Sequence, residues 1–136
     1  MYFHGRSAAV GSQDGSNALF LQIFPAGEGV VHAGYLEQFP TAGLTGKYTC
    51  VEDFYLRARE DAYLAGGIEN GMIVAGHTPT LSKDYMMYNG GLVYQHYDPQ
   101  KNCLYYDIDC GCSYRTVRAN ARLACLCAET GAIYYL

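Results

Sequence analysis

The order of apolar and polar positions predicts a two-stranded hairpin near the N-terminus. Residues 1–17 combine glycine, serine and charged residues without a period of 2 or 3.6, so we expect an irregular leader there. The apolar run ALFLQIF at 18–24 is typical of a strand, and the segment PAGEG that follows it supplies the proline and glycines of a turn. Extended character then resumes, so we expect the second strand of the hairpin to end at His32.

Further along the chain, the apolar pattern changes to one that predicts an amphipathic helix. Apolar side chains recur at spacings of three and four residues, and charged residues fall on the other faces. Thr49 is a candidate N-cap with Glu52 three residues on, and Gly66-Gly67 can adopt the left-handed turn that closes a helix. We therefore expect one clear helix at about 51–66.

The remaining apolar runs predict that the C-terminal half is rich in strands. The run GMIVAG at 71–76 suits a buried strand that stops where His77 begins. Further strands, separated by turn-like segments, are expected at 92–97, 103–108, 121–128 and 132–136. The predicted fold class is therefore α/β (α+β), with mostly mixed or antiparallel strands.

Length and composition are those of one ordinary domain. The chain has 136 residues, and 50% of them are hydrophobic, which is enough for a single core. We detect no internal repeat and no linker, and therefore expect one domain over residues 18–136. The net charge of -4 and the scattered basic residues argue against a nucleic-acid partner.

Two features of the sequence bear on its cellular compartment. No apolar run approaches the roughly 20 residues of a membrane-spanning helix, and no basic segment is followed by an apolar signal core. The six cysteines lie in segments with strand character, which favours reduced thiols over a disulfide framework. The sequence thus predicts a soluble, cytoplasmic protein without a membrane partner.

Two histidines share a local pattern that suits ligand binding. His32 in VVHAG and His77 in VAGHTP each follow an apolar strand and have a glycine close by, which lets a ligand approach the backbone closely. Ligands bind beyond strand ends in α/β sheets, and neutral imidazole is a common metal ligand. Their wide separation fits no compact motif, so both a shared divalent ion and simple hydrogen-bonded histidines remain open.

Three motifs occur in order along the chain: VVHAG at 30–34, AGHTPT at 75–80 and IDCG at 108–111. Together with YLRARED between the first two, they resemble the calcineurin-like metallophosphoesterases, in particular bacterial relatives of Ser/Thr protein phosphatases and diadenosine tetraphosphatases. The resemblance covers residues 18–136 and implies the C-terminal half of a four-layer αββα sandwich. It also implies that His32 and His77 bind one ion of a dinuclear manganese, iron or zinc site.

The N-terminal motifs of that family do not occur in this sequence. In the family, the patterns GDxHG, GDxxDRG and GNHE supply the bridging aspartate, further ligands and the histidine thought to protonate the leaving group. Because a two-metal hydrolase needs both ions, we expect a truncated domain that is catalytically silent alone.

The resemblance still implies a function for the intact enzyme, which is hydrolysis of a phosphorylated protein or a nucleotide by a metal-activated water. The alternative is a non-catalytic remnant or binding module. If the sheet lacks its covering layers, we also expect self-association through its exposed edge and face.

Arginine is the residue that the resemblance places near the substrate phosphate. The segment between the two histidines contains Arg57 and Arg59, and a guanidinium can bind phosphate oxygens through two parallel hydrogen bonds. Arg59 is the nearer match. The alternative is an exposed helix arginine that pairs with Glu60, Asp61 or Tyr63.

The cysteine pairs Cys110/Cys112 and Cys125/Cys127 raise the alternative of a zinc-stabilised module. Structural zinc pairs usually have two to four residues between the cysteines. A spacing of one residue in a strand instead places both thiols on the same face. We therefore expect these cysteines to pack as small apolar side chains.

Overall fold

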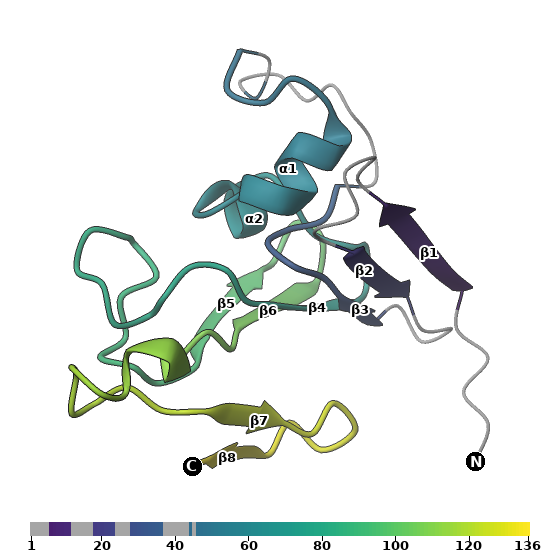
Figure 1. Ribbon diagram of the computed structural model, residues 1–136. Helices are drawn as coiled ribbons and strands as arrows, with labels where there is room; N and C mark the ends of the chain where they lie inside the picture. The colour runs from purple at the N-terminus through teal and green to yellow at the C-terminus, as the bar shows by residue number, and fades with distance from the viewer. Residues whose placement is uncertain (1–5, 12–17, 24–27, 37–43, 45) are drawn as a thin grey trace.

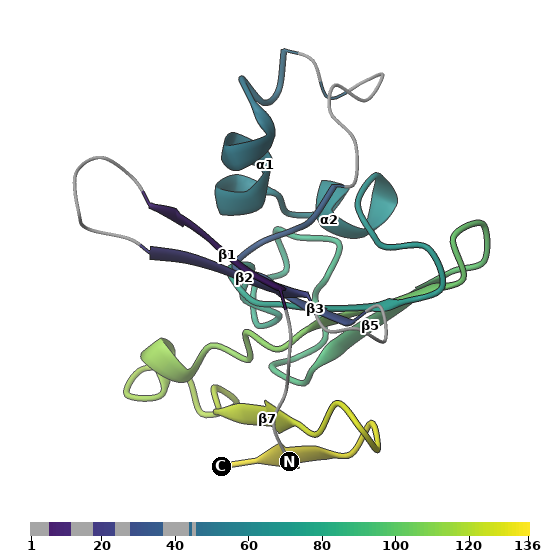
Figure 2. The ribbon, with the colours of Figure 1, turned by 90° about the vertical axis from the view of Figure 1, so that its right-hand side faces the viewer.

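The computed structural model describes residues 6–11, 18–23, 28–36, 44 and 46–136. This part of the chain is mixed α/β, as predicted, with a six-stranded sheet, a separate two-stranded hairpin and two helices. Figures 1 and 2 show that the helices α1 (Val51–Arg57) and α2 (Asp61–Leu64) cover one face of the large sheet. The hairpin of β7 (Ala124–Leu126) and β8 (Ile133–Tyr135) lies on the opposite face.

The large sheet has the strand order β1-β2-β3-β4-β6-β5. Its strands are β1 Arg6–Gly11, β2 Ala18–Ile23, β3 Glu28–Val30, β4 Met72–Ala75, β5 Tyr94–Asp98 and β6 Cys103–Asp107. The predicted hairpin is confirmed, because β2 and β3 pair antiparallel. The centre of the sheet is different: β3, β4 and β6 run parallel, so the segments that follow them meet at one edge.

The prediction that residues 1–17 form an irregular leader is wrong for Arg6–Gly11. These residues form the edge strand β1, which pairs antiparallel with β2 along its whole length. The hydrogen bonds of an antiparallel ladder come from the backbone, so the neighbouring strand can hold a segment whose side chains show no clear period. Residues 1–5 and 12–17 lie outside the described residues.

The prediction of one continuous helix over 51–66 is also wrong. The helix is broken between α1 and α2, where the backbone of Ala58 leaves helical geometry with ψ of 139°. Tertiary contacts override the helical pattern here, since Glu60 Oε1 accepts a hydrogen bond from the Met86 N–H at 3.1 Å. Neither helix is long and apolar enough to cross a membrane, and the same holds for every described helical segment.

The ends of this helical region differ in detail from the predicted caps. The N-cap of α1 is Cys50, which makes no side-chain cap hydrogen bond. The Thr49 N–H instead donates to Asp53 Oδ2 at 3.0 Å, so Asp53 rather than Glu52 closes the turn. At the other end Gly67 has φ of +119°, which agrees with the expected left-handed turn after the helix.

Strand alternation divides the core between the two faces of the sheet. On the helix face, Ile73 and Tyr105 pack against Phe54 and the other buried residues of α1 and α2. On the hairpin face, Tyr106 packs with Cys110 and Ala124, and with partly buried apolar residues of β7 and β8. The strands predicted at 71–76 and 103–108 are confirmed as β4 and β6. Successive side chains of each strand point to opposite faces of the sheet, so each strand contributes to both parts of the core.

Candidate functional site

Backbone pairing beyond the strand ends brings the two predicted histidines together. The parallel ladder of β3 and β4 continues past both strands, because the Gly76 N–H donates to the His32 carbonyl at 2.9 Å. The ladder of β4 and β6 continues in the same way, from the Ile108 N–H to the Ala75 carbonyl at 2.8 Å. His32 and His77 therefore emerge from neighbouring strands at one edge of the sheet.

The two imidazole rings lie side by side at this edge, as the sequence predicted. The Nε2 atom of His32 lies 3.0 Å from the Nδ1 atom of His77, and the ring centroids are 4.7 Å apart. His32 is exposed, whereas His77 is partly buried. A pair of ring nitrogens at this distance can share one proton, or both can offer lone pairs to a third atom.

His77 is held in an unusual backbone and electrostatic environment. Its φ of +76° lies in the left-handed region, where a residue with a Cβ is strained and where functional residues are over-represented. The pKa of His77 is lowered to about 4, mainly by burial and also by the nearby His32 and Arg59, while Asp109 opposes the shift. The imidazole is thus neutral near pH 7, the form that binds a metal ion.

Arg59 lies beside the histidine pair because the helix breaks where it does. Its guanidinium stacks over the Tyr85 ring at 4.4 Å and donates weakly to the Thr78 hydroxyl at 3.5 Å. The alternative of pairing with Glu60 or Asp61 is wrong, since Glu60 accepts from the Met86 N–H and Asp61 accepts from Tyr48 and contacts Lys47. Among the described residues no carboxylate lies within ion-pair distance of Arg59.

Arg57, the other arginine predicted to bind phosphate, points elsewhere. Its guanidinium pairs with Asp53 one turn earlier on α1, and the side chain is exposed. Arg57 is also absent from the residues that line the pocket beside His77. The structure therefore brings Arg59 and not Arg57 to the histidine pair.

Two aspartates to which the sequence analysis assigned no role, Asp107 and, in the IDCG motif, Asp109, also lie at this edge. Asp107 ends β6, and the Asp109 N–H donates to its Oδ1 at 2.9 Å. Asp109 in turn accepts from the Gly111 N–H at 3.0 Å, and its carbonyl accepts from the Thr80 N–H at 2.9 Å. The signal was present in the sequence, since Asp107 directly follows the apolar run CLYY and Asp109 lies two residues further on.

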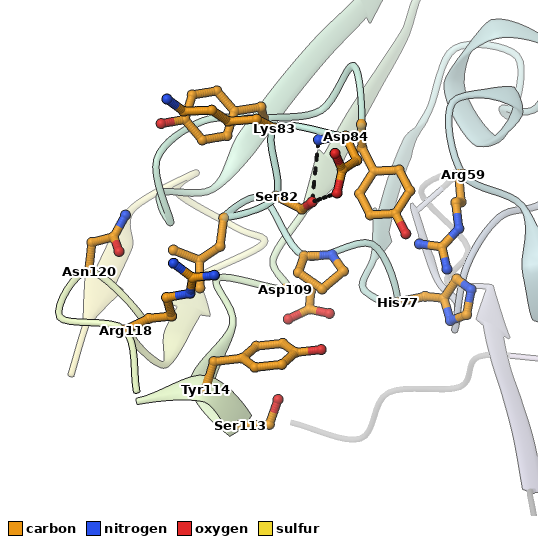
Figure 3. Close-up of a pocket in the computed structure, with 14 residues that line it drawn as sticks. Arg59, His77, Ser82, Lys83, Asp84, Asp109, Ser113, Tyr114, Arg118 and Asn120 are labelled. Carbon is orange, nitrogen blue, oxygen red and sulfur yellow. Dashed lines mark hydrogen bonds between the residues drawn. The ribbon is translucent and has the colours of Figure 1, made fainter. Parts of the chain in front are cut away.

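A polar pocket of about 750 Å³ opens next to His77 and Arg59. Its walls come from two loops, residues 79–88 and 113–120, and from Asp109 after β6. Figure 3 shows His77 and Arg59 on one side, Arg118 and Asn120 on the other, and Asp109 between them. The pocket thus adjoins the histidine pair and is lined by side chains that can bind a charged ligand.

The cysteines give no support to a zinc module. All six lie in the described part of the chain, and none forms a disulfide, as predicted. Of the four cysteines in the two sequence pairs, only Cys110 is buried in the core, as Cys103 also is. Cys112 and Cys127 are half-buried and Cys125 is exposed, so the expectation that all four pack as small apolar side chains is wrong for Cys125. Across the described residues no group of three or more His, Cys, Asp and Glu side chains is arranged to hold a metal ion.

Comparison with known proteins returned no protein-family model, no curated protein and no solved structure that matches this chain.

Proposed function

We propose that His32 and His77 together bind one divalent metal ion, and that the chain takes part in metal-dependent hydrolysis of phosphoesters. The observation that carries the proposal is the pair of ring nitrogens 3.0 Å apart at the ends of two parallel strands. The fold we propose is the C-terminal half of a metallophosphoesterase αββα sandwich. In support, the helices α1 and α2 and the hairpin β7–β8 lie on opposite faces of a mixed sheet.

The geometry and chemistry of the histidine pair fit a metal ion. Two nitrogens at about 2.1 Å from a metal are about 3.0 Å apart in adjacent positions of an octahedral site and about 3.4 Å apart in a tetrahedral one. The two ring nitrogens of this structure are 3.0 Å apart, which fits the octahedral geometry. The lowered pKa of His77 keeps its nitrogen free of a second proton at neutral pH. Manganese, iron and zinc all accept imidazole ligands, so the metal follows from availability.

The metal would polarise a phosphoryl oxygen and activate a water molecule. The remaining groups at the site belong to this chain. Arg59 has no carboxylate partner among the described residues and lies on the same side of the pocket as His77. A guanidinium in this position binds and orients an anionic phosphate next to the histidine pair. Tyr85 supports that guanidinium through a cation–π contact, with Arg59 Cζ 4.4 Å from the ring centroid.

Isothermal titration calorimetry of the purified chain with Mn²⁺ tests the proposal. We expect one ion to bind per chain and to bind at least about tenfold more weakly to His32→Ala and His77→Ala, because each variant removes one ligand. The matched control is His96→Gln. His96 lies on β5, where its ring packs against Tyr63 at a centroid distance of 4.5 Å.

Circular dichroism would confirm that all three variants are folded before their affinities are compared. Equal affinity of wild type, H32A and H77A would overturn the assignment of the two histidines. An equal loss in H96Q would show that Mn²⁺ binds histidines without regard to this site, and would overturn it as well.

A further inference from the structure

The pocket beside the histidine pair has a second positive end. Arg59, Lys83 and Arg118 line it, together with the carboxylates of Asp84 and Asp109. The lining therefore carries one more positive than negative charge, although the whole chain has a net charge of -4. This excess of positive charge favours an anionic ligand over a cationic one.

The positive charges at this second end are available to a ligand. Lys83 lies over the Tyr88 ring at 5.7 Å, and no described carboxylate lies within ion-pair distance of Lys83 or Arg118. Both side chains are exposed. Figure 3 shows Arg118 across the pocket from His77, so its guanidinium is well separated from that of Arg59.

The loop that carries Arg118 is fixed by hydrogen bonds of its backbone and of Asn120. It begins with the short helix η1 (Cys112–Tyr114), and the Arg118 N–H donates to the Tyr114 carbonyl at 2.9 Å. The Ala121 N–H donates to the Arg118 carbonyl at 3.1 Å, and Asn120 Nδ2 donates to the Gly90 carbonyl at 2.9 Å. A charged side chain on a loop held in this way loses less backbone freedom when it binds a ligand.

We propose that Arg118, with Lys83, forms a subsite for a second anionic group, so that the pocket takes a small molecule with two phosphate groups. The first phosphate lies at Arg59 and His77, and the second lies at Arg118. The assignment of the first phosphate to Arg59 and His77 rests on the proposed function. A volume of about 750 Å³ favours a small molecule, because pockets for such ligands measure about 300–1,000 Å³.

Binding of inorganic tripolyphosphate and of inorganic phosphate, measured by calorimetry with EDTA present, tests the subsite without any metal. We expect tripolyphosphate to bind at least about tenfold more tightly than phosphate. Arg118→Gln should weaken tripolyphosphate binding about five- to tenfold, the usual net effect of one hydrogen bond, and change phosphate binding less than about twofold. Arg59→Gln should weaken both ligands.

The control is Arg115→Gln, which removes the same charge from the same loop at a residue that does not line the pocket. We expect it to change tripolyphosphate binding less than about twofold. An equal loss in R115Q and R118Q would show a general effect of net charge and overturn the subsite, as would equal affinity for the two ligands. Because metal is excluded, these outcomes are separate from failure of the histidine pair to bind Mn²⁺.

Discussion

The stability of the fold should depend on pH through the buried carboxyl of Asp107. This residue is 0% exposed, and among the described residues its Oδ2 atom has no hydrogen-bond partner. Burial raises the pKa of Asp107 to about 8; the Asp109 N–H and Arg59 oppose the shift, and the charge of Asp109 adds to it. The carboxyl is therefore protonated in the folded protein at neutral pH and ionised in the unfolded chain.

The magnitude follows from the two pKa values. Below the unfolded pKa of 3.8, Asp107 is protonated in both states and has no effect on stability. Between 3.8 and about 8 the unfolded chain releases a proton that the folded protein retains, so the free energy of unfolding falls as the pH rises. At about 1.4 kcal/mol per pH unit, the loss between pH 4 and pH 7 is about 4 kcal/mol at most.

The substitution Asp107→Asn removes this dependence, because an amide does not titrate. Its buried N–H groups lack acceptors and cost about 1–3 kcal/mol at every pH. We therefore expect the variant to be less stable than wild type at pH 4 and closer to it or more stable at pH 7. Urea unfolding, monitored by circular dichroism at pH 4, 5, 6 and 7, measures the free energy of unfolding of wild type and of the variant.

A matched control is Asp98→Asn, at the partly exposed end of β5. The free energy of unfolding of this variant should change with pH about as steeply as that of wild type. If wild type and Asp107→Asn instead lose stability in parallel as the pH rises, the protonated, buried carboxyl is not the cause and the reasoning fails.

Two further predictions concern packing and activity. Gly34→Ala would place a Cβ 2.9 Å from Phe54 Cε1, so we expect a loss of about 1–3 kcal/mol in urea unfolding, and an unchanged midpoint would contradict the tight contact. Two imidazoles supply only part of one coordination sphere. With added Mn²⁺ the chain should therefore hydrolyse p-nitrophenyl phosphate no faster than the His32→Ala, His77→Ala double variant, and metal-dependent turnover that only wild type shows would refute this.

Local apolar patterns were sufficient to predict most strands. The run 71–76 and the segments around β5 and β6 have the composition and turn-like flanks of strands, and the structure contains strands there. The break after Arg57 was not predictable in this way, because the apolar spacing continues through it. It depends on contacts with a loop that lies about 26 residues further along the chain, such as the hydrogen bond from Met86 to Glu60.

The site was predictable in part for a similar reason. Each histidine follows an apolar strand and lies near a glycine, a local signal that pointed to both of them. Arg59 and Arg57 could not be separated from the sequence, since their positions relative to the pocket depend on the helix break. Arg118 was missed because it lies in an irregular loop, where sequence alone does not determine which side chains face a cavity.

The parallel pairing at the centre of the sheet has a consequence for how the protein folds. His32 and His77 are 45 residues apart, so neither ring meets the other until β3 and β4 have paired across the whole intervening chain. Hairpins such as β5–β6 need only a short turn, whereas pairing over a long separation is slow because the chain must first lose much of its freedom. The histidine pair should therefore form late in folding, after the local hairpins, and its assembly would report that the central sheet is complete.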